Sequence, residues 1–196
     1  AAALSEELQS RGVSAWTVGG DLSDKDQVRG LFQRAVEIAG PIDILINNAS
    51  IYEKETLWDS SAESILRNMQ IHSVAPLVLA RDFARQERGG HIVNLLDTRI
   101  TACDRQHASY HLSKRTLATL TRMLAMELAP KVAVNAVAPG LILPPAGEDE
   151  SYLEKLAHCN PLNRYGSPTD VAEAVLFLLA SRFVTGWLSA QNPHPR

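Results

Sequence analysis

Short apolar runs alternate with stretches of helical periodicity along the whole chain, and this alternation restricts the fold more than any other feature. The helical patterns follow an opening helix that stops at Gly12 and cover residues 25–39, 61–86, 108–128, 151–158 and 169–180. The strand-like runs occupy residues 13–18, 42–46, 91–96 and 132–137. Strands joined through helices form right-handed crossovers and a parallel sheet covered on both faces. We therefore predict a doubly wound α/β domain.

Residue types at the ends of these patterns support the assignment. Asp24 is a typical N-cap residue, and Gly40-Pro41 breaks the helix that Asp24 begins. The next run, Ile42-Asp43-Ile44-Leu45-Ile46, is short and almost wholly apolar. That composition predicts a strand buried on both faces of the sheet.

Composition and charge exclude several other classes of protein. Of the 196 residues, 45% are hydrophobic and 21% charged, and the formal net charge is −3. These values are typical of a soluble globular domain and argue against a nucleic-acid partner. No apolar run approaches the roughly 18 residues of a membrane span, and no secretion signal is recognisable. Cys103 and Cys159 fit neither a metal-site spacing nor a disulfide framework, which favours reduced thiols in a cytoplasmic protein.

Polar or small residues follow each predicted strand. In doubly wound sheets, ligands bind beyond the carboxyl ends of the strands, where the topology switches. The segments at these ends are Gly19-Gly20-Asp21, Asn47-Asn48-Ala49-Ser50, Asp97-Thr98-Arg99 and Pro139-Gly140. We expect a small-molecule site where these segments meet.

Tyr110 and Lys114 stand four residues apart near the start of a predicted helix, so both side chains leave the same face. An ammonium beside a phenol favours the phenolate, which makes the tyrosine a better proton donor near neutral pH. The spacing alone favours an ordinary tyrosine beside a solvated lysine. Asp97, which ends the preceding strand, and Pro139-Gly140, which follow the next strand, favour a catalytic pair instead.

In this order the pieces resemble the short-chain dehydrogenase/reductase family, over residues 1 to about 186. The matching pieces are Asp21-Leu22, Asn47-Asn48-Ala49-Ser50, Tyr110-x-x-x-Lys114, Val134-Asn135-x-x-x-Pro139-Gly140 and Phe183-Val184-Thr185-Gly186. The resemblance implies a Rossmann-like sheet, an oxidoreductase activity, and NADP(H) as the cofactor, with NAD(H) as the other candidate. NADP(H) is preferred because it is the cofactor of the branch of the family that this chain resembles most, which is described below.

The resemblance also implies a role for each matching residue. Tyr110 would be the proton donor, and Lys114 would bind the nicotinamide ribose. Cofactor contacts are implied along the rest of the strand ends: Asp21 and Leu22 at the adenine, Asn48, Ala49 and Ser50 at the ribose and phosphates, and Pro139, Gly140 and Ile142 at the nicotinamide.

Two departures from the family pattern point to that narrower branch. Asp97 stands where most members carry a serine, and His72 stands where most carry a catalytic asparagine. Both are similar to the pteridine reductase and dihydromonapterin reductase branch. An ionised aspartate can only accept hydrogen bonds. Asp97 therefore suits a substrate rich in N–H donors, such as a pterin, and a bond to Tyr110 would let it relay a proton.

Three further residues have two interpretations each. Tyr52 is either a platform on which the substrate ring stacks or a loop tyrosine at the surface. His72 is either a proton relay or a histidine that bridges two stretches of backbone. Ser50 would bond a polar group of the substrate or a cofactor phosphate.

Other candidates are weaker. His107 and His111 have the spacing of metal ligands, but no third ligand is evident, so we predict no metal site. Residues 148–150 read as a solvated loop end, although in the family this region is a mobile lid. The stripe Leu117, Leu120, Leu124 and Leu128 predicts core and subunit interface, and the resemblance implies a homotetramer or a dimer.

No Gly-x-x-x-Gly-x-Gly turn occurs in the chain, and residues 187–196 form an atypical tail with two prolines. We interpret the chain as lacking the family's first βαβ portion and its glycine-rich loop. The strand ending at Asn47 would then lack a neighbour, and NADPH binding by these 196 residues would be weak.

The sequence leaves three functions open. The first is an NADPH-dependent reductase acting on a dihydropterin- or dihydrofolate-like ring. The second is a general carbonyl reductase of the same family. The third is a non-catalytic fragment kept for oligomerisation, which the intact Tyr110 and Lys114 argue against.

Overall fold

The centre of the molecule is a parallel sheet of four strands, in the order β1-β2-β3-β4. The computed structural model describes residues 1–100, 104–145 and 147–191. The strands are β1 (Ile44–Asn47), β2 (Gly90–Leu95), β3 (Val132–Ala138) and β4 (Leu188–Ala190). All three pairings are parallel. The predicted α/β class is confirmed.

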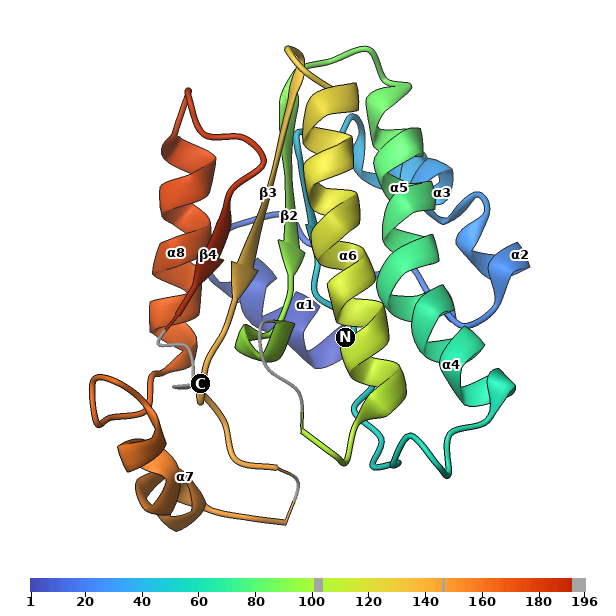
Figure 1. Cartoon of the computed structure of the whole chain (residues 1–196). Helices are drawn as coiled ribbons and strands as arrows, with labels where there is room; N and C mark the ends of the chain where they lie inside the picture. The colour runs from blue at the N-terminus through green and yellow to red at the C-terminus, as the bar shows by residue number, and fades with distance from the viewer. Residues whose placement is uncertain (101–103, 146, 192–196) are drawn as a thin grey trace.

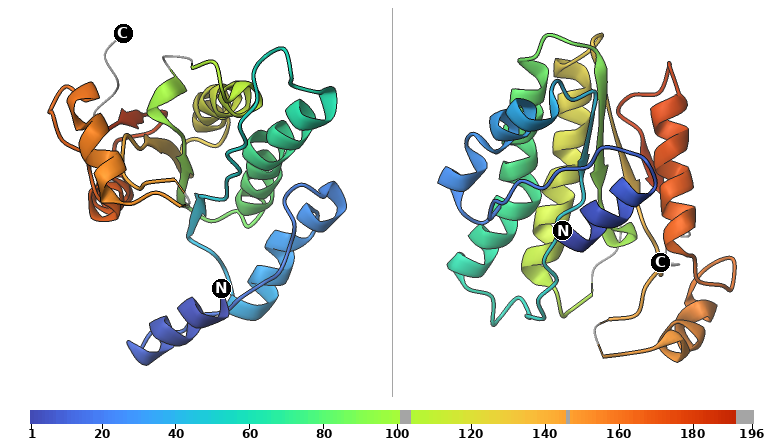
Figure 2. Two further views of the ribbon diagram at one scale, coloured as in Figure 1. Left: turned by 90° about the horizontal axis from the view of Figure 1, so that it is seen from below. Right: turned by 180° about the vertical axis from the view of Figure 1, so that it is seen from behind.

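Helices cover both faces of the sheet (Figures 1 and 2). One long helix, made of α4 (Ala62–Met69), a π-helical segment (Gln70–Val74) and α5 (Ala75–Ala84), lies beside α6 (Ala108–Glu127). α8 (Pro168–Ala180) packs on the other face. No helix among the described residues is both long enough and apolar enough to cross a membrane.

The core is divided between these two faces because side chains alternate along a strand. Ile92 and Val134 face the first helix layer, where Phe83 packs edge-on against Phe32 with 6.1 Å between ring centroids. Val93 and Val137 face the opposite way and pack with Leu178 of α8. Strands buried on both sides hold the carboxyl edge of β2 and β3 firmly.

Of the three N-terminal helices, two pack against α5, and the first projects away from the sheet (Figure 2). They are α1 (Ala2–Ser10), α2 (Lys25–Val28) and α3 (Leu31–Ala39). Asp24 caps α2 as predicted, because its carboxylate accepts the N–H groups of Asp26 and Gln27. The single helix predicted over residues 25–39 is wrong. Gly30 adopts a left-handed conformation (φ 77°) that breaks it into α2 and α3.

Two predictions about strands are also wrong. Residues 13–18 form no strand, because no described strand lies beside them to pair with their backbone. β1 is not buried on both faces, since Ile44 and Ile46 are 44% and 45% exposed. β1 is an edge strand among the described residues, which agrees with the expectation that it lacks a neighbour on one side.

The chain rejoins the sheet beyond residue 186. The buried side chain of Asn135 bonds to the carbonyl of Val184 at 2.9 Å and to the N–H of Trp187 at 3.0 Å. This clamp delivers residues 188–190 to β3, where they pair as β4. Both prolines of the predicted tail lie outside the described residues, as does Cys103, whereas Cys159 is a free thiol.

A small helical region lies beyond the carboxyl ends of the strands (Figure 1). It consists of α7 (Glu150–Leu156) followed by a short 3₁₀ turn (Ala157–Cys159). Asp149 caps α7 through the N–H of Ser151. A second 3₁₀ turn (Thr98–Ile100) follows β2 directly. α7 and this second turn both border a cavity at the strand ends.

Candidate active site

A cavity of about 500 Å³ opens at the carboxyl ends of β2 and β3, where the sequence predicts ligand binding. Its walls come from the loop after β1, the ends of β2 and β3, the first turns of α6, and the α7 region. The predicted site residues that line it are Asn48, Ser50, Tyr52, Asp97, Tyr110, Lys114, Pro139, Gly140 and Ile142.

Asp97 and Tyr110 are joined by a hydrogen bond in this cavity. The Tyr110 hydroxyl donates to Oδ2 of Asp97 over 3.0 Å. Asp97 comes just after β2, and Tyr110 sits in the first turn of α6. The ring of Tyr110 is buried, with 7% of its surface exposed. The polar end of the tyrosine is therefore held at a fixed point on the cavity wall.

Lys114 lies one helical turn behind Tyr110. Its Nζ donates to the carbonyl of Leu95 over 2.7 Å and lies 5.7 Å from the centroid of the Tyr110 ring. Burial lowers the pKa of Lys114 to about 8, although the charge of Asp97 opposes this shift. The ammonium is still the main form at neutral pH, so it places a positive charge beside the phenol.

His72 connects the loop after β1 to α6. Its Nε2 accepts the N–H of Ile51 at 3.1 Å, which puts the ring proton on Nδ1, where it is donated to Oγ of Ser113 at 2.8 Å. Burial, together with the charge of Lys114, lowers the pKa of His72 to about 3. The ring is therefore neutral at physiological pH, and both nitrogens are bonded within the protein.

Tyr52 makes aromatic contacts at the rim of the cavity. Its ring stacks on His107 with 3.9 Å between centroids and meets the edge of Tyr110 at 4.8 Å. About half of its surface is exposed. Tyr52 is thus held in place by protein rings while part of it faces the cavity.

The remaining residues that the sequence predicts to bind the cofactor lie farther along the strand ends. Leu22, Asn48 and Ala49 line a smaller hollow of about 140 Å³, and Asn48 and Lys114 line both hollows. Asp21 lines neither. Its carboxylate accepts two bonds from Ser23, both 2.8 Å, and these lower the pKa of Asp21.

Sequence reasoning placed one further residue of the cavity wall and missed others. Thr98, in the predicted segment after β2, is buried there, and its N–H bonds to the carbonyl of Pro139 at 3.2 Å. Tyr152 of α7 and Val171 of α8 also line the cavity. The periodic pattern of residues 151–158 predicts α7, but nothing in that pattern indicates that the helix lies over the strand ends.

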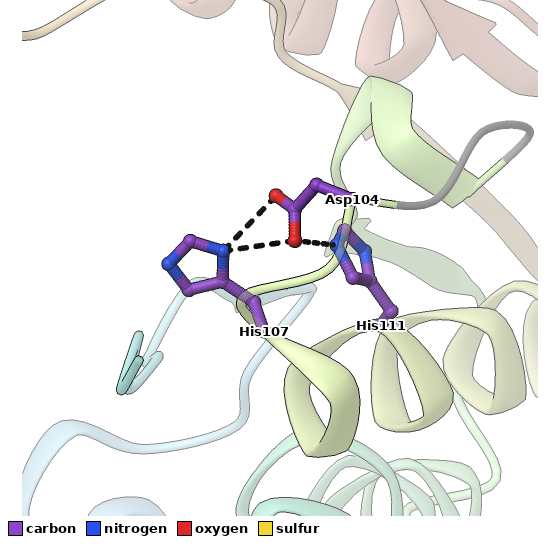
Figure 3. Close-up of side chains that lie close together, drawn as sticks. All are labelled: Asp104, His107 and His111. Atoms are coloured by element: carbon purple, nitrogen blue, oxygen red, sulfur yellow. Dashed lines mark hydrogen bonds and ion pairs between the residues drawn. The ribbon is translucent and has the colours of Figure 1, made fainter. Parts of the chain in front are cut away.

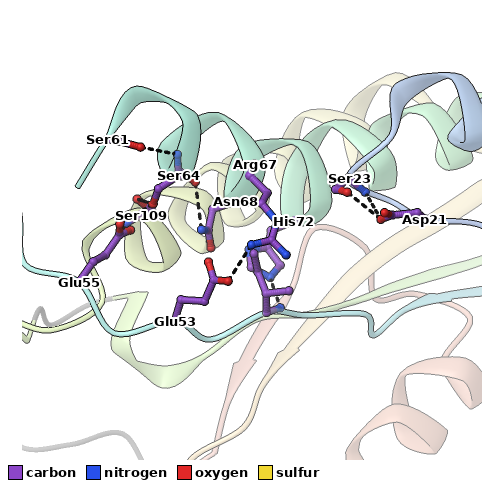
Figure 4. A network of polar contacts seen from close by, with 11 residues as sticks. Asp21, Ser23, Glu53, Glu55, Ser61, Ser64, Arg67, Asn68, His72 and Ser109 are labelled. Atoms are coloured by element: carbon purple, nitrogen blue, oxygen red, sulfur yellow. Dashed lines mark hydrogen bonds and ion pairs between the residues drawn. The ribbon is translucent and has the colours of Figure 1, made fainter. Parts of the chain in front are cut away.

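A second polar cluster supports the start of α6 (Figure 4). Glu55 accepts hydrogen bonds from the hydroxyl of Ser64 and from the N–H of Ser109, the latter at 3.2 Å. Burial alone would raise the pKa of Glu55, but bonds from Ser109 and Ser64 outweigh it and lower this pKa. The ionised carboxylate ties α4, α6 and the loop after β1 together.

The histidine pair His107 and His111 has a third neighbour that the sequence did not indicate (Figure 3). Oδ1 of Asp104 lies 3.2 Å from Nδ1 of His107 and 3.2 Å from Nε2 of His111. The prediction that the pair lacks a third ligand is therefore wrong for the folded chain. Asp104 comes close to the two histidines only because the loop before α6 turns back toward the helix, and the sequence pattern does not indicate that turn.

Comparisons with known proteins find relatives over nearly the whole chain. A family profile described as enoyl-(acyl carrier protein) reductase matches residues 1–189. The 3-oxoacyl-[acyl-carrier-protein] reductase FabG of Staphylococcus aureus is 30% identical over 200 residues, covering 95% of this chain and 79% of that protein.

Solved structures of similar fold include two with a bound dinucleotide. The FolM alternative dihydrofolate reductase 1 of Brucella canis, complexed with NADP, has a TM-score of 0.87 and 33% identity over 96% of this chain and 76% of that one. A blue fluorescent protein from a metagenomic library, in complex with NADPH, has a TM-score of 0.88 and 32% identity over 99% and 81% of the two chains.

Proposed function

The chain belongs to the short-chain dehydrogenase/reductase family of oxidoreductases, and from this premise we propose that it is an NADP(H)-dependent reductase of a dihydropterin- or dihydrofolate-like ring. The observation that carries the proposal is the hydrogen bond between Tyr110 and the carboxylate of Asp97 in the cavity. It sets a proton donor beside an obligate hydrogen-bond acceptor.

The described residues fit the cofactor. Lys114 and Asn48 line both the main cavity and the smaller hollow that reaches Leu22, so an elongated ligand can pass along the strand ends. Pro139 and Gly140 form the opposite end of that path. When bound, the cofactor supplies a hydride. The NADP and NADPH held by the similar solved structures support NADP(H) over NAD(H).

In this proposal the protein supplies the proton. Tyr110 gives its hydroxyl proton to the ring nitrogen that gains an electron pair as the neighbouring carbon is reduced. The ammonium of Lys114 stabilises the phenolate that remains, since it lies 5.7 Å from the ring centroid. The carboxylate of Asp97 accepts an N–H of the substrate and passes a proton from water back to Tyr110.

Other residues position these groups. Tyr52 offers a half-exposed ring on which a flat heterocycle can stack, and Ser50 lies on the same rim. His72 acts as a positioning residue, because both nitrogens are engaged by Ile51 and Ser113. Its role is to hold the loop after β1 against α6.

The second candidate function is a carbonyl reductase. The relatives named 3-oxoacyl-[acyl-carrier-protein] reductase favour it, because they are as similar to this chain as the dihydrofolate reductase structure is. A carbonyl oxygen accepts hydrogen bonds but donates none. Its lone pairs would meet the carboxylate of Asp97, so this chemistry suits a serine at position 97 better than an aspartate.

Replacing Asp97 separates the two candidates. In the natural protein, Asp97→Ser should lower kcat/KM for a dihydropterin by about tenfold or more, because about 1.4 kcal/mol of binding to an N–H is lost. Reduction of a simple ketone should be unchanged or faster. The matched control is Asp97→Asn, which keeps the size of the side chain and removes its charge. A wild-type enzyme that reduces 3-oxo compounds faster than every dihydropterin tried would assign the carbonyl function instead.

Self-association belongs to the same proposal. α4 and α6 carry exposed apolar side chains at Leu66, Leu112, Met123 and Met126. Their exposure supports a homo-oligomer in which these helices pair between copies. The cytoplasm is the proposed location.

A further inference from the structure

Asp104, His107 and His111 form a cluster that the proposed reductase chemistry does not use. Nδ1 of His107 lies 3.0 Å from Oδ2 of Asp104 and 3.2 Å from Oδ1. Nε2 of His111 lies 3.2 Å from the same Oδ1. One ligand atom from each of the three residues can be chosen so that all lie within 4.8 Å of one another (Figure 3).

The local structure fixes this arrangement. His107 and His111 are separated by one turn at the start of α6, where the N–H of His111 bonds to the carbonyl of His107 at 2.9 Å. Oδ1 of Asp104 accepts the N–H of Gln106 at 2.8 Å, which turns the loop back toward the helix. The carboxylate is therefore aimed between the two rings before any ligand arrives.

Burial makes the cluster unusual. Each histidine is only 5% exposed. Nε2 of His111 has no hydrogen-bond partner, although it lies within ion-pair distance of Asp104. A buried imidazole nitrogen without a hydrogen bond carries a free-energy cost, and a ligand at this point would remove it.

The donor set identifies the ligand class. Two imidazole nitrogens and one carboxylate oxygen suit a divalent transition metal such as Zn²⁺ better than Mg²⁺ or Ca²⁺, which prefer oxygen ligands. Ligand atoms around a tetrahedral Zn²⁺ stand about 3.3 Å apart. The two 3.2 Å separations from Oδ1 of Asp104 are close to that value. We propose that Asp104, His107 and His111 bind one Zn²⁺-like cation per chain.

The three side chains supply two imidazole nitrogens and one carboxylate oxygen. Three protein ligands leave a fourth position of a tetrahedral ion for water.

A metal here would act on the substrate side of the active site. Tyr110 lies between His107 and His111 in the chain, and the ring of Tyr52 stacks on His107. A cation bound to Nδ1 of His107 would fix that ring and thereby the platform of Tyr52. It would also join the loop at Asp104 to α6. The site is a structural clamp beside the cavity, independent of which substrate the enzyme reduces.

Calorimetric titration of Zn²⁺ into the metal-free natural protein tests the proposal. We expect one Zn²⁺ per chain and a higher melting temperature when the metal is present. His111→Ala and Asp104→Asn should each weaken binding by about 100-fold or more, since a directly coordinating group is removed. His158→Ala is the matched control, because His158 is exposed and lies beside Cys159, an alternative place for adventitious metal.

Two results would overturn the inference. One is wild-type protein that binds no Zn²⁺ at micromolar concentration, a measurement that needs no variant. The other is equal binding by wild type, His111→Ala and Asp104→Asn, each shown by circular dichroism to be folded. Loss of binding in His158→Ala alone would assign the metal to the surface pair instead.

Discussion

Tyr110 lies near one negative and one positive side chain, Asp97 and Lys114. The two act on different parts of the tyrosine. The carboxylate of Asp97 contacts its hydroxyl directly, at 3.0 Å. The ammonium of Lys114 is bound to the carbonyl of Leu95 and acts on the ring from 5.7 Å. The carboxylate orients the hydroxyl proton, whereas the ammonium favours the anion left after that proton has gone.

Removing the hydroxyl tests this division of roles. Tyr110→Phe should reduce turnover by about 100-fold or more, because the proton donor is lost while the ring and its packing remain. NADPH affinity should change little, since Lys114 and Asn48, which we propose contact the cofactor, are kept. Stopped-flow turnover and fluorescence titration of NADPH measure the two quantities. Near wild-type turnover in the variant would remove Tyr110 from the mechanism.

Which side chains of the site lie together is easier to predict when the residues are close in the sequence and on one helix. Tyr110 and Lys114 share a face because they are four residues apart on one helix, and the register of that helix is clear in the sequence. Asp97 is placed by the end of a strand. Asp104 is different, because the turn through Gln106 that aims it at His111 is set by loop hydrogen bonds that leave no periodic pattern.

The π-helical segment, residues 70–74, is the element that joins α6 to the loop after β1. It widens the long helix by one residue per turn at the point where His72 and Ser73 both contact Ser113 of α6. Such segments are rare inside α-helices and frequent at functional sites. Here the widening aims the ring of His72 at the loop after β1, 3.1 Å from the N–H of Ile51.

His72 should make this element sensitive to acid. Its pKa is about 3 in the folded protein and near 6.5 when unfolded, so the unfolded state binds a proton first. The free energy of unfolding therefore falls as the pH drops from about 6.5 toward 3. His72→Asn lacks this loss, so the stability advantage of the wild type should shrink over that range. Urea unfolding at several pH values checks it, and parallel pH curves for the two proteins would contradict it.

The ends of helices and strands can be predicted where a capping or helix-breaking residue marks them. They cannot be predicted where backbone conformation or pairing with another strand determines them. Asp24 and Gly40 begin and end helices as expected. The apolar periodicity of residues 25–39 continues across Gly30, so the sequence shows no sign of a break there. The break comes from the left-handed backbone conformation of Gly30. The alternation in residues 13–18 is real, but a strand also needs a partner edge, which the described sheet does not place beside them.

Across the whole molecule, packing is uneven. β2 and β3 are covered on both faces, and Val134 of β3 and Phe83 of α5 have almost no exposed surface. α1, by contrast, contains no buried residue. It is linked to residues 13–18 mainly through bonds from Ser5 and Gln9 to the carbonyl of Ala15. The N-terminal segment therefore adds little to the free energy of unfolding of the described sheet.

Limited proteolysis of the 196-residue chain should reveal this difference. Segments with few buried contacts open locally at low free-energy cost, so the first cuts should fall within residues 1–20 while the rest resists. Deleting residues 1–12 should lower the melting temperature by less than about 3 °C. Phe83→Ala, the contrasting change, removes a buried ring and should cost about 3–5 kcal/mol, a much larger shift. Mass spectrometry of the early fragments and calorimetric melting of both variants measure these effects. A deletion as damaging as Phe83→Ala would mean that α1 packs against the sheet in solution.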